Sequence, residues 1–171
     1  MDTLVQKPQN DQRMNRTIRV ERDTMGTIET TYDLTRDLTI AKAVGKMRAE
    51  DHRRWIKSYY AGNNVTQLIL WDVTEADYSE ITNQEIQNHV AFTKQLATDA
   101  RKGGKTAVVI DRDRSILGLS RMREIYFKME GVPIDMRTFY DMDDALQWLD
   151  VKDTRKWISK PAKTTRSSKE P

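Results

Sequence analysis

The chain has 171 residues, of which 37% are hydrophobic and 32% are charged, which is typical of one globular domain and not of a disordered chain. It contains no cysteine, and this excludes disulfides, thiolate metal sites and cysteine nucleophiles. No apolar run approaches the ~18 residues that span a bilayer, and the amino end lacks the apolar core of a signal peptide. We therefore expect a cytoplasmic protein.

The net charge of +3 is distributed unevenly along the chain. Residues 152–171 hold seven Lys/Arg and two Asp/Glu, a balance of +5 that leaves −2 for residues 1–151. We expect a flexible amino-terminal arm over 1–16, a domain over 17–151 and a flexible basic tail over 152–171. Because the basic charge belongs to the tail, we expect no nucleic-acid binding by the domain. A tail that tethers nucleic acid or an acidic membrane is the alternative.

The segments that we expect to be strands carry alternating or continuous apolar residues between turn signals. They are 17–22, 27–34, 38–44, 68–71, 107–110 and 134–140. The first two form a predicted β-hairpin around a turn at 23–26. Apolar stripes with helical spacing predict helices over 48–61, 83–102 and 116–130, with Gly62 and Ser115 as caps, and a short helix after Asp141. Trp148 is expected on the inner face of that last helix.

This order predicts a single α/β domain with a mixed sheet of about five or six strands and four helices. Right-handed crossovers place helices over the sheet, and the order permits all of them on one face. His52 and His89 lie on or beside the apolar stripes of the first two helices. We interpret His52 as a partly buried residue that packs on the sheet, and His89 as a packed or edge residue. No partner for metal binding has helical spacing from His52.

The central strand is predicted from the unbroken apolar run Leu68 to Trp71, which ends at Asp72. A polar connection follows, and Thr82 with Glu85 makes a capping box at the start of the next helix. Ligands and partners of open α/β sheets dock at the carboxyl ends of the strands. We therefore predict a recognition surface over residues 72–86.

Four stretches together resemble the STAS-like family of anti-sigma-factor-antagonist-like bacterial proteins. These are the strand LILWDV, the strand AVVID, the helix RMREIYFKM and the ending MRTFYDMDDALQWL. The most specific part is the pattern F-x-(D/E)-x-(D/E)-x-A-x-x-W-L at Phe139, Asp141, Asp143, Ala145, Trp148 and Leu149. The resemblance covers 17–151 and implies a non-enzymatic regulatory module that binds a protein partner.

In switching antagonists of this family, the corresponding loop carries an aspartate–serine pair, and the partner kinase phosphorylates the serine. This chain departs from that pattern, since the spacing is altered, the glycine is absent and Glu80 adds negative charge. The resemblance makes Ser79 and Thr82 candidate phosphoacceptors by position, although capping already accounts for Thr82. The predicted partner-binding residues are Asp72, Asp77, Ser79, Glu80 and Thr82.

Signatures of catalysis are absent from the sequence. It contains none of G-x-x-x-x-G-K-[ST], G-x-G-x-x-G, G-x-S-x-G or H-E-x-x-H, so we expect no enzyme, no metal and no cofactor. Asp111 and Asp113 could hold a hard cation, but a solvated loop is the preferred interpretation. A receiver-type phosphate acceptor at Asp72 with Lys105 is a further alternative, and it lacks the acidic pair that would hold magnesium.

A second function stays open beside protein binding. The aromatic and methionine content of the first and third predicted helices permits a pocket for a small apolar, lipid-like ligand between helices and sheet. The protein would then be a carrier or sensor. The identity of the protein partner and the formation of a homo-oligomer are left open by the sequence.

Overall fold

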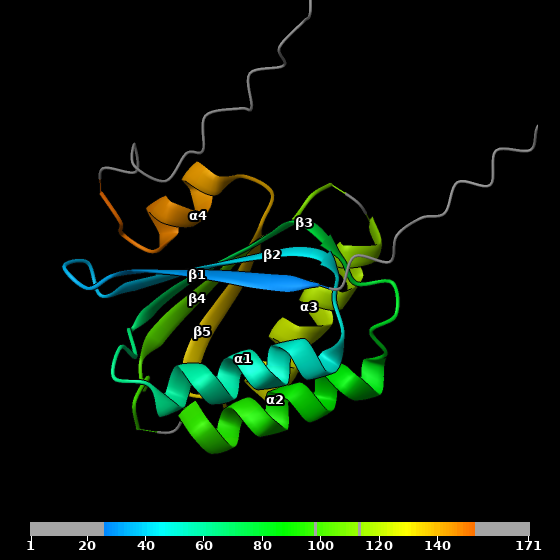
Figure 1. Ribbon diagram of the computed structural model, residues 1–171, viewed down its shortest axis with the longest axis horizontal. Helices are drawn as coiled ribbons and strands as arrows, with labels where there is room; N and C mark the ends of the chain where they lie inside the picture. The colour runs from blue at the N-terminus through cyan, green and yellow to red at the C-terminus, as the bar shows by residue number, and fades with distance from the viewer. Residues whose placement is uncertain (1–25, 98, 113, 153–171) are drawn as a thin grey trace, which may run out of the picture.

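The computed structural model describes residues 26–97, 99–112 and 114–152. Strands and helices follow one another in the order β1 (Thr27–Asp33), β2 (Leu38–Lys46), α1 (Ala49–Ala61), β3 (Leu68–Asp77), α2 (Asn83–Ala97), β4 (Gly104–Val109), α3 (Arg114–Met129), β5 (Ile134–Phe139) and α4 (Met142–Trp148). They form one five-stranded sheet in the order β1-β2-β3-β4-β5 (Figure 1). β1 is antiparallel to β2, and all other pairs are parallel. The predicted mixed sheet with four helices is thus confirmed.

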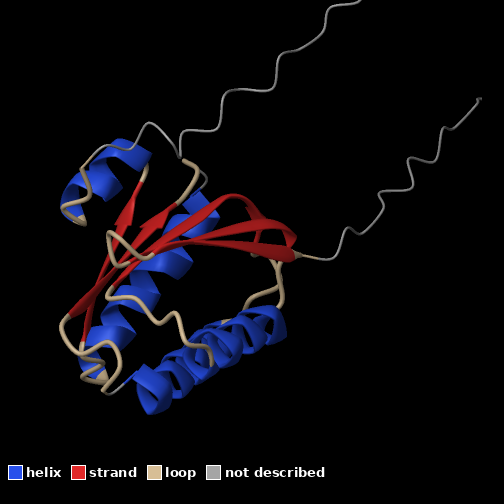
Figure 2. Cartoon of the chain, turned by 60° about the vertical axis from the view of Figure 1, so that its left-hand side comes forward, coloured by secondary structure: helices blue, strands red, loops and turns tan. Residues whose placement is uncertain are grey.

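The helices cover both faces of the sheet, not one. α1, α2 and α3 lie on one face, and α4 lies alone on the other (Figure 2). Alternation along β3 explains the two layers, because Trp71 packs in the core beneath α1–α3 while Leu70 packs with Leu146 of α4. The central run of β3 is therefore covered on both faces, as its unbroken apolar character predicts.

β3 is longer than the sequence predicts, since it continues from Asp72 to Asp77. Val73 and Ala76 are 4% and 7% exposed and face the core, whereas the polar residues between them do not. A register shift between Lys42 and Val44 of β2 accompanies this extension. The exposed Thr74 and Glu75 interrupt the apolar run, and this is why the sequence predicts an earlier end of the strand.

Several predicted boundaries differ from those in the structure. α2 ends at Ala97 and not at residue 102, and α3 begins at Arg114, so residue 115 lies within the helix and not before its first residue. α1 ends at Ala61, and Gly62 is its C-cap, as the sequence predicts. Several predicted segments lie outside the described residues: the arm 1–16, the strand 17–22, the turn residues 23–25 and all but the first residue of the tail 152–171.

A buried arginine connects the amino ends of β3 and β4. Arg101 is 2% exposed. Its guanidinium donates to the carbonyls of Thr66 (2.9 Å), Gln67 (2.8 Å) and Lys105 (2.7 Å), and to the hydroxyl of Thr106 (3.1 Å). These oxygens satisfy the donors of the buried cation and hold the two strands in register.

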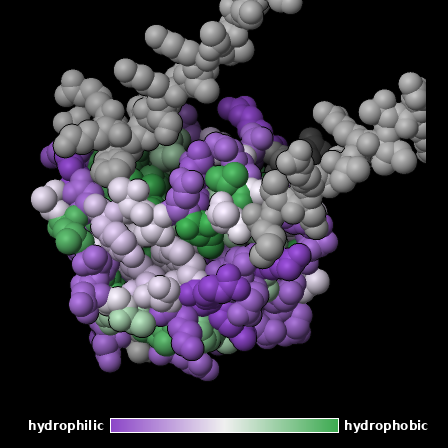
Figure 3. Space-filling view, viewed as in Figure 1, coloured by the Kyte–Doolittle hydropathy of each residue, from purple (hydrophilic) through white to green (hydrophobic). Residues whose placement is uncertain are grey.

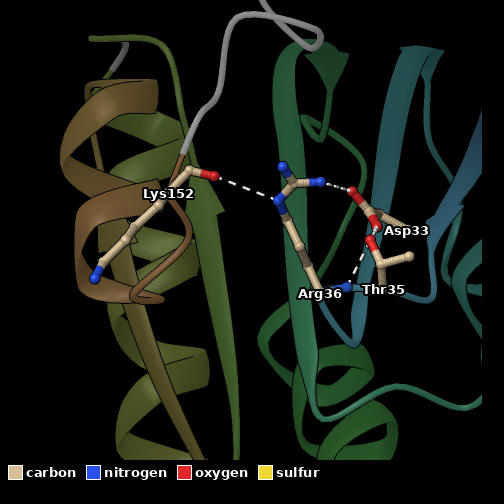
Figure 4. A network of polar contacts seen from close by, with 4 residues as sticks. All are labelled: Asp33, Thr35, Arg36 and Lys152. Carbon is tan, nitrogen blue, oxygen red and sulfur yellow. Dashed lines mark hydrogen bonds and ion pairs between the residues drawn. The ribbon is translucent and has the colours of Figure 1, made fainter.

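The turn between β1 and β2 is tied to the segment that follows α4 (Figure 4). The Arg36 guanidinium donates to the Asp33 carboxylate (2.6 Å) and to the carbonyl of Lys152 (3.3 Å). Hydrogen bonds from the Thr35 hydroxyl and from Arg36 lower the pKa of Asp33. Val151, one residue before Lys152, is buried. The domain limits 17–151 stay a prediction.

α4 begins as the sequence predicts. The Asp141 carboxylate accepts hydrogen bonds from the backbone amides of Asp143 and Asp144. Trp148 is less buried than expected, because it lies at the rim of α4 against Phe139, with Lys105 and Arg137 over its ring. No helix in the described part of the chain is long and apolar enough to cross a membrane.

Candidate functional site

A pocket lies beneath the three helices that share one face of the sheet. It is formed by the amino-terminal half of α1, by α2 and α3, by β3 and β4, and by the loop between β3 and α2. Its volume of about 70 Å³ exceeds the roughly 10–15 Å³ that one water requires. Most of its wall is apolar and comes from Val73, Ile81, Ile86, Val108, Ile116 and Leu119.

Four polar side chains form one corner of this pocket, which we call the basic corner: His52, Tyr78, His89 and Arg123. The Tyr78 hydroxyl lies 3.0 Å from His52 Nε2. The two imidazole rings meet edge to face with centroids 5.7 Å apart. Arg123 Nη2 lies 2.6 Å from His89 Nε2. The basic corner thus joins α1, the β3–α2 loop, α2 and α3.

The Arg123–His89 contact fixes the protonation of His89. A guanidinium can only donate, so His89 Nε2 must accept, and the ring is neutral with its proton on Nδ1. Burial, with the charge of Arg123, lowers the pKa of His89 well below its ordinary value. The same two causes lower the pKa of His52 to about 3.

The remaining members of the basic corner keep their ordinary charge at neutral pH. Burial raises the pKa of Tyr78, so its phenol is protonated. Burial lowers the pKa of Arg123 to about 10, which leaves the guanidinium charged near pH 7. The basic corner therefore carries one positive charge, located on Arg123.

Two buried nitrogens of the basic corner have no hydrogen-bond partner within the described ranges: His52 Nδ1 and Arg123 Nε. His52 is only 5% exposed. No carboxylate of the described residues forms an ion pair with Arg123. Arg101 shows the contrast, since acceptor oxygens surround it. An apolar wall with a few polar groups left to bind is the usual composition of a small-molecule site.

A groove of about 460 Å³ adjoins this pocket on the outside, between the amino-terminal halves of α1 and α2. The two share Ala49, Ile81, Glu85 and His89. The groove is mixed in character, with the charged side chains of Arg48, Glu50, Arg53 and Glu80 beside Phe92. Arg53 lies over the Phe92 ring, 5.2 Å from its centroid.

Four of the five predicted partner-binding residues lie together in the exposed loop from Asp77 to Thr82. The Asp77 carboxylate accepts from the backbone amide of Ser79 (2.8 Å), and this hydrogen bond lowers the pKa of Asp77. Glu80 forms an ion pair with Lys46 (2.8 Å). Thr82 and Glu85 form the predicted capping box. The recognition role of these residues stays a prediction.

Asp72 does not join this loop. It lies within β3, between the core-facing residues Trp71 and Val73, and so points to the opposite face of the sheet. Its carboxylate accepts from the amide (3.1 Å) and the hydroxyl (2.6 Å) of Thr74. The structure therefore separates Asp72 from the other four predicted residues.

The receiver-type alternative is wrong in its geometry. Lys105 pairs with Leu68 at the start of β3, while Asp72 pairs with Val109 at the far end of β4. Lys105 Nζ donates instead to the carbonyl of Trp148 (3.1 Å). Asp111 is exposed. The described residues contain no group of three His, Asp or Glu side chains that could hold a metal ion.

The sequence predicts that His52 is partly buried and that His89 is a packed or edge residue, but it does not bring the two together. The two histidines lie on different helices, so no helical or strand spacing in the sequence connects them, and Tyr78 comes from a loop. The only available signal was a basic residue, Arg123, on the inner face of a helix whose other inner residues are mostly apolar.

On the face seen in Figure 3 the described surface is largely hydrophilic, with separate small hydrophobic areas.

Comparisons with known proteins give structural matches only. No protein-family model matches the chain, and no curated protein matches it. An anti-sigma factor antagonist from Mycobacterium paratuberculosis is similar with a TM-score of 0.48 and 13% identity, covering 73% of this chain and 94% of that one. An uncharacterised protein with a SpoIIAA-like fold from Shewanella loihica has a TM-score of 0.44 and 22% identity, covering 72% and 93%.

Proposed function

We propose that this protein is a non-enzymatic, cytoplasmic carrier or sensor of a small, largely apolar ligand that occupies the pocket beneath α1, α2 and α3. One observation carries the proposal: His52 Nδ1 and Arg123 Nε are buried at an open pocket without a partner among the described residues. Buried donors need acceptors, and a ligand that accepts from both nitrogens would supply them. The apolar wall supplies the rest of the binding surface.

Native mass spectrometry of the freshly purified full chain tests this function. Ser120→Leu adds a side chain to the pocket wall and should abolish any bound mass while the circular dichroism spectrum stays unchanged. Gly118→Ala is the matched control on α3, because a Cβ there meets no atom within 4 Å. If the wild type carries no bound mass, and no small amphiphile raises its melting temperature, the pocket is not a ligand site.

A second proposed function is protein binding by the loop from Asp77 to Thr82. The observation that favours it is the loop's position, since Tyr78 and Ile81 line the pocket while Asp77, Ser79 and Glu80 face solvent. A ligand in the pocket would touch the inner side of the same loop that presents this acidic surface. The protein would then be a regulatory module, as the sequence predicts.

Combined alanine substitution of Asp77, Ser79 and Glu80 tests the loop. We expect an unchanged fold and weaker binding in a pull-down, whereas Asp135→Ala, at an exposed position on β5, should leave binding intact. Unfolding of the triple variant, or unchanged binding, would contradict this role. Phosphorylation of Ser79 or Thr82 remains part of the same proposal, and a phosphate there would stand beside Glu80 and Glu85.

A further inference from the structure

The positive charge at the pocket indicates the charge of the ligand, which the shape of the pocket does not. Arg123 is the only charged member of the basic corner, since both imidazoles and the Tyr78 phenol are neutral near pH 7. Arg123 is half-buried, and a cation that is partly removed from water favours a counter-ion. Glu85, the acidic residue in the pocket lining, is bound to Thr82 and forms no ion pair with Arg123.

Arg101, which is fully buried, shows what this protein does when a guanidinium has only a structural role. Arg101 donates to three carbonyls and a hydroxyl, so its donors and its charge are met by strand-end oxygens. Arg123 donates to one neutral imidazole, and its Nε is buried without an acceptor in the described part of the chain. The half-buried Arg123 also lies over the Phe127 ring, 5.8 Å from its centroid, but this contact gives its buried Nε no acceptor.

We infer that the ligand carries a single carboxylate, which binds Arg123 in the basic corner while its hydrocarbon part lies against the apolar wall. This inference rests on the proposed ligand-binding function. One oxygen accepts from Arg123 Nε, and the carboxylate also accepts from His52 Nδ1. His52 can donate there because the Tyr78 hydroxyl can donate to Nε2, which places the ring proton on Nδ1.

The single charge of Arg123 favours a carboxylate over a phosphate dianion. One guanidinium neutralises one negative charge, and a phosphate dianion would leave a second charge buried among Ile86, Val108 and Leu119. A carboxylate is also planar, which suits the edge of a guanidinium. The acid could be short, or it could be the head of a longer lipid whose chain reaches the adjoining groove.

The test compares hexanoate with hexanamide, a neutral molecule of the same shape, by calorimetry on the full chain near pH 7. Loss of one partner of a buried charge pair predicts that the acid binds at least about 30-fold more tightly. Arg123→Met should bring this ratio near one. Arg121→Met, at an exposed position on the same helix, should leave the ratio unchanged.

The ratio of hexanoate to hexanamide affinity in the wild type tests the inference even if Arg123→Met does not fold. Hexanoate should also protect the Arg123 Nε proton and the His52 Nδ1 proton from exchange in NMR spectra, and hexanamide should not. Equal binding of acid and amide would overturn the carboxylate and leave the ligand-binding function standing. Binding of neither would overturn the inference, and native mass spectrometry then decides the function separately.

Two further probes identify the source of the carboxylate and exclude the dianion. Displacement of hexanoate by inorganic phosphate at a lower concentration than by acetate would overturn the single-charge argument. Tighter binding of dodecanoate than of hexanoate, again with a preference over the matching amide, would support the head of a lipid acid. Tighter binding of hexanoate, with the same preference, would support a short free acid.

Discussion

Acid sensitivity caused by His52 is a direct consequence of the basic corner. Burial, with Arg123 nearby, lowers the pKa of His52 from its ordinary 6.5 to about 3. Between these values the unfolded chain binds a proton that the folded chain excludes, so this contribution to stability is present in full above pH 6.5 and decreases as the pH falls toward 3. At pH 5.0 the loss is about 2 kcal/mol, at about 1.36 kcal/mol per pH unit below 6.5.

The assay is urea unfolding at pH 7.5 and pH 5.0 for the wild type and for His52→Gln. Glutamine does not titrate and can still hydrogen-bond to Tyr78, so the variant should lose about 2 kcal/mol less than the wild type on acidification. His89 titrates in both proteins. Carboxylates with a lowered pKa, such as Asp33 and Asp77, are also shared and cancel in the difference. An equal loss in the two proteins would refute the reasoning.

Four substitutions test the fold by the free energy of unfolding in urea. Arg101→Met removes a buried donor from several strand-end carbonyls and should lower the free energy of unfolding by about 3 kcal/mol or more. A loss below about 1 kcal/mol would mean that water replaces the guanidinium. Gly104→Ala places a Cβ 2.6 Å from the Gln67 carbonyl oxygen and should cost about 1–3 kcal/mol; a neutral effect would show that the backbone shifts freely. Asp141→Ala removes the cap of α4 and should cost about 1 kcal/mol, with Asp141→Asn as the conservative control. Trp148→Ala should lower the free energy of unfolding by about 2 kcal/mol, less than the ~3–5 kcal/mol of a fully buried aromatic residue. A loss of about 3–5 kcal/mol would mean that the ring is fully buried.

Apolar runs and capping residues were sufficient to predict most of the fold. The run Leu68 to Trp71 predicts a strand buried on both faces, and Asp141 predicts the start of α4. The face that each helix covers could not be predicted in the same way. An apolar stripe shows that a helix is buried, but the side of the sheet depends on how the chain leaves β5, and α4 lies opposite the other three helices.

The loop from Asp77 to Thr82 and its capping box were predictable because they rest on neighbours in the chain. The pocket was not. His52, His89 and Arg123 each fit an inner helical position by themselves, and only the packing of α1, α2 and α3 brings them together. For Asp72 the prediction was wrong in the opposite way. Its closeness in sequence to the loop suggested a shared surface, but side chains alternate along β3, and Asp72 points to the other face of the sheet.

The strands succeed one another in the sheet in the order in which they leave the ribosome. Each strand after β2 is carried by one helical crossover to the free edge of the strand before it, so none has to enter between two that are already paired. The sheet can grow from one edge during synthesis. The pocket draws its wall from α1 through α3, so it closes only after α3 has docked. A nascent chain that stops before α3 exposes the apolar surface that α3 covers, and this stage of synthesis is where association with other chains would begin.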